Sequence, residues 1–175
     1  MAKAPRRPRA GVSYVTSSTY ERRPIFEISR VAALFIESLL HYRTLGHYKL
    51  HAYVVMPDHV HLLITPQNIT LDQAVHLIKE GFAHLLETEL PVWDQSFTAY
   101  SIANIHELEV ARAKLHQLPV RASLAASAEL YPHSSAFRTS TLVPSHSPII
   151  PTASPDQESD RTFPDSETTH LRKVS

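Results

Sequence analysis

The sequence of 175 residues contains no cysteine and only three glycines. Without thiols, a disulfide scaffold, a thiolate zinc site and a cysteine nucleophile are all excluded. No glycine-rich phosphate-binding loop is present, so nucleotide-dependent chemistry is not expected. A chain of this length is nonetheless long enough to bury a core in a single domain.

The sequence also lacks a long hydrophobic run and an excess of either charge. No apolar stretch approaches the roughly 18–20 residues that a membrane-spanning helix needs. The basic start is not followed by the apolar segment of a secretory signal, so we expect a soluble, cytoplasmic protein with no membrane partner. Lys plus Arg and Asp plus Glu number 17 each, which excludes a uniformly basic coat for nucleic acid.

The charges are unevenly distributed along the chain. Residues 1–49 carry nine Lys or Arg and three Asp or Glu, whereas residues 50–138 carry five and nine. The N-terminal surplus of positive charge predicts either contact with phosphate groups or a solvated basic tail. Charge by itself does not separate these two interpretations.

Composition divides the chain into three zones. Residues 1–10 form a basic, proline-broken arm that we expect to be flexible. Residues 11–138 carry hydrophobic periodicity and form the predicted domain. Residues 139–175 contain 18 Ser, Thr or Pro among 37 residues. They are predicted to be disordered, because they cannot bury enough apolar surface to offset the chain entropy.

The periodicity of the middle zone predicts alternating strands and helices. A capping box at Thr70 and Gln73 opens the second helix, and Pro119 is expected to end the third. The first six elements have the order of an α+β, ferredoxin-like split βαβ sandwich, with a central antiparallel sheet and two helices on one face. The expected strands are 12–18, 48–55, 59–65 and 97–101, and the expected helices are 28–42, 71–86 and 104–118.

Two histidines separated by one residue occur in the third predicted strand. Side chains two residues apart on a strand point to the same face, so His59 and His61 can both reach one metal ion. Neutral imidazole is a common ligand of first-row divalent metals. The alternative is a pair of polar residues on an exposed sheet face, and this spacing by itself does not decide between them.

Residues 53–64, which include the string MPDHVHLLI, strongly resemble the HUH motif of the small tyrosine transposases of bacterial insertion sequences. Within that family the resemblance is strongest to the REP-associated tyrosine transposases. It extends over residues 11 to about 137. Further similar segments are Arg22–Phe26, Ile78–Phe82, Val92–Phe97, Pro119–Ala122 and Tyr131–Ala136.

The resemblance implies metal-dependent cleavage and rejoining of single-stranded DNA near a hairpin. In the family, two histidines and a third polar residue hold Mg²⁺ or Mn²⁺ against the scissile phosphate. The metal ion withdraws charge from the phosphoryl oxygens. A tyrosine then attacks phosphorus and forms a 5′-phosphotyrosine, which preserves the bond for rejoining. The resemblance makes His59 and His61 the two histidine ligands.

The chain departs from the family on the third helix. The family has its nucleophilic tyrosine and its third metal ligand there, four residues apart, and the corresponding residues are Lys114 and Leu118. Lys114 is then either a phosphate contact or an exposed helix lysine. Gln117 is one residue from the position of the third ligand, and it can act as a metal ligand only if the helix shifts. Tyr100 is a fallback nucleophile, or more simply a packed aromatic.

Several functions remain open at this point. The chain is an active transposase with another nucleophile, a catalytically inactive DNA-binding descendant, or a metal-binding protein of unrelated purpose. It is expected to act as a monomer or a homodimer. The candidate phosphate contacts, each of which is otherwise a solvated tail or surface residue, are Arg6, Arg7, Arg9, Arg22, Arg23 and Lys79.

Overall fold

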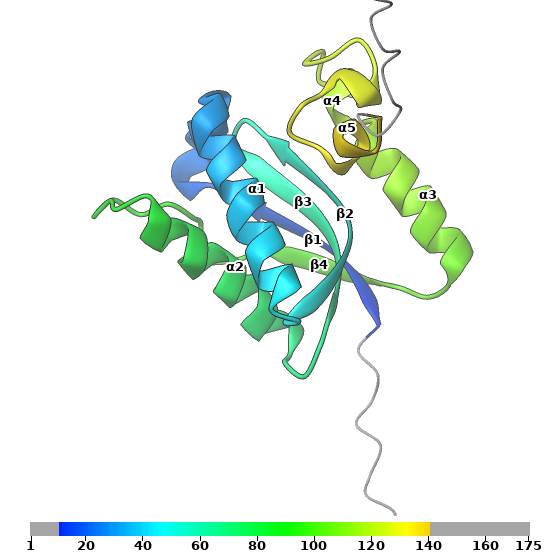
Figure 1. Ribbon diagram of the computed structural model, residues 1–175, viewed down its shortest axis with the longest axis horizontal. Coiled ribbons are helices and arrows are strands. Elements are labelled where there is room, and N and C mark those ends of the chain that lie inside the picture. Colours follow the sequence, from blue (N-terminus) through cyan, green and yellow to red (C-terminus); the bar gives the residue numbers. More distant parts are fainter. Residues whose placement is uncertain (1–10, 141–175) are drawn as a thin grey trace, which may run out of the picture. The chain divides into compact units, whose positions relative to one another are not determined.

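The computed structural model describes residues 11–140, which form a four-stranded sheet with helices on both sides (Figure 1). The strand order is β2-β3-β1-β4, and every neighbouring pair is antiparallel. This arrangement confirms the predicted α+β, ferredoxin-like fold. The strands are β1 (Val12–Ser18), β2 (Tyr48–Met56), β3 (His59–Pro66) and β4 (Thr98–Ile102).

Helices α1 (Ser29–Thr44) and α2 (Leu71–Leu85) cover one face of the sheet, as predicted (Figure 1). The side chains of Val60, Leu62 and Ile64 point from β3 into the apolar cluster beneath these helices. Helix α2 begins at the expected capping box. The Thr70 hydroxyl accepts from the Gln73 backbone N–H at 3.2 Å, and the Gln73 side chain accepts from the Thr70 N–H at 2.9 Å.

The opposite face carries α3 (Ile105–His116), α4 (Leu118–Arg121) and α5 (Ser135–Ser140) (Figure 1). Helix α3 starts at the Asn104 cap and ends at His116, before the proline that was expected to end it. Pro119 instead lies in the first turn of α4, where its missing N–H leaves no hydrogen bond unmade. Short 3-10 helices occupy Tyr20–Arg22, Ile25–Glu27 and Ala128–Leu130.

The free edge of β2 is covered by the segment that leads into α5. The Val55 N–H donates to the His133 carbonyl at 2.9 Å, and the Tyr53 N–H donates to the Ser135 hydroxyl at 3.0 Å. These bonds occupy backbone groups that an open edge strand leaves available for pairing with another chain. Tyr131 adds a hydroxyl bond to the same strand.

The predicted arm 1–10 and nearly all of the predicted tail lie outside the described residues. Helix α5 runs to Ser140, so helical structure extends just past the predicted domain boundary at residue 138. Among the described residues, no helix combines the length and apolar character needed to cross a membrane.

Candidate functional site

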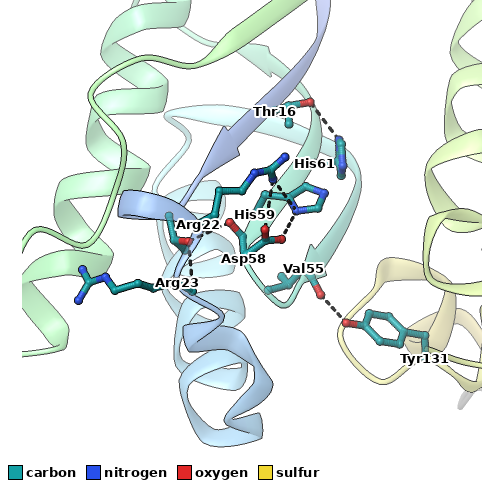
Figure 2. A network of polar contacts seen from close by, with 9 residues as sticks. Thr16, Arg22, Arg23, Val55, Asp58, His59, His61 and Tyr131 are labelled. Atoms are coloured by element: carbon teal, nitrogen blue, oxygen red, sulfur yellow. Dashed lines mark hydrogen bonds and ion pairs between the residues drawn. The ribbon is translucent and has the colours of Figure 1, made fainter. Parts of the chain in front are cut away.

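His59 and His61 project together from the α3 side of the sheet. Val60 between them points into the cluster under α1 and α2, while Leu63 joins the cluster under α3. The centroids of the two imidazole rings are 4.8 Å apart, and the ring planes meet at 81°. Strand alternation therefore places both rings at one site, next to the β2–β3 turn (Figure 2).

The His59 imidazole is held by the turn that precedes it. Its Nδ1 lies 2.5 Å from the Asp58 Oδ1, and the Arg22 Nη1 lies 3.3 Å from the Asp58 Oδ2 and 3.5 Å from the same Nδ1 (Figure 2). The short contact to the carboxylate favours the tautomer in which Nδ1–H donates to Asp58. That tautomer leaves a lone pair on Nε2, as in histidines that ligate metals.

The His61 imidazole is anchored by β1. Its Nδ1 lies 3.0 Å from the Thr16 Oγ1 and 3.2 Å from the Tyr14 Oη. Burial lowers the pKa of His61 to about 4, with further lowering by His59 and Arg22. The ring is therefore neutral near pH 7 and retains the lone pair that a metal ligand or hydrogen-bond acceptor requires.

Tyr14 links the histidine pair to the fourth strand. It pairs directly with Tyr100 across β1 and β4, and the two rings stack with centroids 4.9 Å apart and planes 9° from parallel. Burial, with a smaller contribution from Tyr100, raises the pKa of Tyr14 to about 12. Strand alternation in β1 groups Tyr14 with Thr16, but only the register of β1 against β3 brings both against His61.

A groove between β4 and α3 adjoins Tyr100. It has a volume of about 370 Å³ and is lined by Tyr100 and Lys114, among others. Lys114 is exposed on α3, whose buried side is formed by Leu108, Ala111 and Leu115. The structure thus brings Lys114 to the same groove as Tyr100, on the side of the sheet that carries the histidines.

Among the described residues, no third His, Cys, Asp or Glu side chain joins the two imidazoles in a group that could hold a metal. Gln117 caps α3 and is exposed, and Leu118 packs against the apolar cluster under that helix. Within residues 11–140, no hydrogen bond joins Gln117 to either histidine, and no group of three His, Cys, Asp or Glu side chains is arranged to hold a metal. The role of Gln117 as a third ligand, which requires a shift of this helix, therefore stays a prediction.

The family model for IS200-like transposases matches residues 14–113, which is more than half of the chain. The chain belongs to this transposase family. The matched range includes His59 and His61 and stops one residue before Lys114, so the alignment of Lys114 with the family tyrosine stays a prediction. No curated protein matches the sequence.

Two solved structures resemble this family member. A REP-associated tyrosine transposase, solved with a bound REP hairpin, matches with a TM-score of 0.67 and 19% identity, over 81% of this chain and 87% of that chain. A candidate transposase of Deinococcus radiodurans R1 matches with a TM-score of 0.49 and 19% identity, over 67% of this chain and 98% of that chain. The first likeness agrees with the fold.

The side chains that were predicted to contact phosphate lie in different environments. Arg22 reaches the histidine site with a side chain that is 60% exposed. Arg23 turns away, because its Nη2 donates to the Pro91 carbonyl and its Nε donates to the Tyr20 carbonyl at 3.3 Å. The remaining predicted arginines, Arg6, Arg7 and Arg9, lie outside the described residues.

Lys79 does not fit the expected role of a DNA contact. It is only 8% exposed, and its Nζ donates to the backbone carbonyls of Asp94, Gln95 and Ser96. The Trp93 Nε1 donates back to the Lys79 carbonyl at 3.1 Å. Two of the family-like segments, 78–82 and 92–97, are thus joined for structural reasons, and a buried ammonium satisfied by carbonyls is not free for phosphate.

Proposed function

We propose that this IS200-like family member binds single-stranded DNA next to a hairpin, on the α3 side of its sheet, without forming a phosphotyrosine through α3. The observation that carries the proposal is the anchored pair His59 and His61, on the same side of the sheet as a groove that Lys114 lines. The resemblance aligns Lys114 with the family's tyrosine. The hairpin bound to the solved relative supports DNA as the partner.

Arg22 and Lys114 supply the positive charge for this interaction. Both side chains are exposed, and Arg22 lies at the histidine pair while Lys114 lines the groove. Cations that contact phosphate groups orient a strand and make its affinity fall with salt, without reading the sequence. The neutral total charge of the chain confines this attraction to the site and to the basic N-terminal end.

His59 and His61 are the residues that would hold Mg²⁺ or Mn²⁺. Asp58 and Thr16 contact the Nδ1 atoms of the two rings, which suits coordination through Nε2. A bound ion would supply Lewis-acid polarisation of a phosphoryl oxygen. Because the resemblance aligns Leu118 with the third family ligand, we expect weak metal affinity in the absence of DNA, with a preference for Mn²⁺ over the harder Mg²⁺.

One observation favours a second candidate, an active transposase with a different tyrosine. The Tyr14 hydroxyl lies 3.2 Å from the Nδ1 of His61, so a tyrosine oxygen is in contact with the histidine pair. Its raised pKa of about 12 disfavours the phenolate that attacks phosphorus. We therefore rank this candidate below DNA binding without cleavage.

The test combines binding with covalent trapping. The full-length protein is titrated into fluorescein-labelled hairpin DNA with a single-stranded flank, and into the same hairpin without the flank, with and without Mn²⁺. The expected result is flank-dependent binding that weakens with salt, and no adduct on denaturing gels. No binding at low salt would refute the proposal, whereas an adduct abolished by Tyr14→Phe would establish the second candidate.

A further inference from the structure

Four aromatic rings form a continuous row across the α3 side of the sheet. The centroid distances are 4.8 Å from His59 to His61, 5.7 Å from His61 to Tyr14 and 4.9 Å from Tyr14 to Tyr100. The row runs from the β2–β3 turn through β3 and β1 to β4, and each step joins side chains on one face. It therefore leads from the proposed metal ligands to the outer strand of the sheet.

Tyr100 is the open end of this row. Its side chain is 57% exposed, although one ring face is covered by the nearly parallel ring of Tyr14. The exposed area consequently belongs to the opposite face and the edge of the ring. A large aromatic ring held flat by a neighbour and open to solvent on its other face has the form of the platforms on which proteins stack single-stranded bases.

The groove beside Tyr100 has the chemistry of a nucleotide site. Its volume of about 370 Å³ is bounded by the apolar side chains of Ile102, Val110 and Ala111, with Lys114 on its lining as a cation. Apolar walls suit the faces of a base, and an ammonium suits the phosphate attached to it. A duplex base pair does not fit this description, because its bases are already stacked within the helix.

We propose that Tyr100 stacks one unpaired base of single-stranded DNA in this groove, and that Lys114 binds an adjoining phosphate. This inference rests on the proposed function, because it specifies where the single strand lies. It assigns Tyr100 a binding role carried by the ring, in place of the nucleophilic role that would be carried by the hydroxyl.

The other charged groups of the groove are compatible with a bound nucleotide. Glu107 lines it, but its Oε2 accepts from the Ala103 N–H at 2.8 Å, and its Oε1 accepts from the Asn104 amide at 3.4 Å. The carboxylate is thus engaged at the start of α3. Burial raises the pKa of Tyr100, so the phenol remains uncharged near pH 7 and does not repel phosphate.

The stacking role makes a prediction that separates ring from hydroxyl. Tyr100→Phe keeps the ring and should bind hairpin DNA with a single-stranded flank within about twofold of the wild type. Tyr100→Ala should bind about 5- to 100-fold more weakly, the usual effect of removing a stacking aromatic. Leu45→Ala is the matched control, because Leu45 is also 57% exposed but lies at the end of α1 in the other helix layer.

The measurement is fluorescence anisotropy with fluorescein-labelled flanked hairpin DNA, with circular dichroism to verify that each full-length variant is folded. An abasic nucleotide scanned along the flank should weaken wild-type binding at one position and leave Tyr100→Ala unaffected there. Equal binding by wild type and Tyr100→Ala overturns this inference and leaves the proposed function intact, as does an equal loss in Tyr100→Phe and Tyr100→Ala. Failure of the wild type to bind overturns both.

Discussion

The hydroxyl of Tyr131 donates to the backbone carbonyl of Val55 at 2.7 Å, within the segment that covers the edge of β2. Both residues are buried, so the carbonyl has no access to solvent if the hydroxyl is removed. Tyr131→Phe should therefore lower the free energy of unfolding by about 1–2 kcal/mol. Urea denaturation measures this loss, and Tyr20→Phe, at a 37% exposed tyrosine, should remain within about 0.5 kcal/mol of the wild type.

Removal of the charge is predicted to weaken DNA binding at Arg22 and to lower the stability of the fold at Lys79. Arg22→Ala removes an exposed guanidinium, so DNA binding should weaken and its salt dependence should decrease by about one phosphate contact. Lys79→Met removes a buried ammonium that donates to carbonyls in the 94–96 segment, so stability should fall by roughly 1–3 kcal/mol. Anisotropy titrations at several salt concentrations and urea denaturation test the pair. A Lys79→Met variant that is as stable as the wild type but binds DNA more weakly would show that Lys79 does contact DNA.

Gly81 lies where α2 approaches the ring of Tyr42 on α1. A Cβ at this position would lie 2.4 Å from the Tyr42 ring. In an open helix, alanine at a glycine position is favourable by about 1 kcal/mol, but here we expect Gly81→Ala to destabilise the protein by about 1–3 kcal/mol. The double variant Gly81→Ala with Tyr42→Leu should recover part of the loss, and thermal denaturation of the three proteins checks this coupling.

Acid should destabilise the domain through its partly buried histidines. Burial lowers the folded-state pKa values of His51, His61, His116 and His133 below 6.5, with His61 at about 4. The unfolded chain therefore binds more protons below pH 6.5, and stability falls as pH decreases from about 6.5 toward 4. Urea midpoints at pH 7 and pH 5 measure the slope. His61→Gln should reduce it, and an unchanged slope would contradict the burial of a neutral imidazole.

Placing the family residues at positions 114 and 118 tests the alignment of this segment with the family. Lys114→Tyr with Leu118→Asn returns a phenol near the end of α3 and a third candidate metal ligand at the start of α4. Incubation with Mn²⁺ and flanked hairpin DNA should yield a protein–DNA adduct that the wild type does not form. Adding His61→Gln should abolish the adduct. A folded double variant that binds DNA without forming an adduct would contradict the placement of Lys114.

The Lys79 and Lys114 side chains show where prediction from sequence reached its limit. Both lie on amphipathic helices whose positions were predicted to within a few residues, because apolar spacing and caps act locally. Their environments depend on other segments. The backbone carbonyls of residues 94–96 accept hydrogen bonds from Lys79. Strand β4 places Tyr100 in the groove that Lys114 lines. The α3 terminus was placed too late, because Pro119 begins a new helix as readily as it ends one.

The sequence by itself determined the order of the four strands and the three long helices, the common face of His59 and His61, and the absence of a tyrosine at position 114. Each follows from local periodicity or residue identity. Only the tertiary structure decided that Tyr14 and Thr16 anchor His61, because antiparallel register joins residues about 45 positions apart. The aromatic row ending at Tyr100 has the same origin, since a slip of one residue in any strand would send its ring to the opposite face.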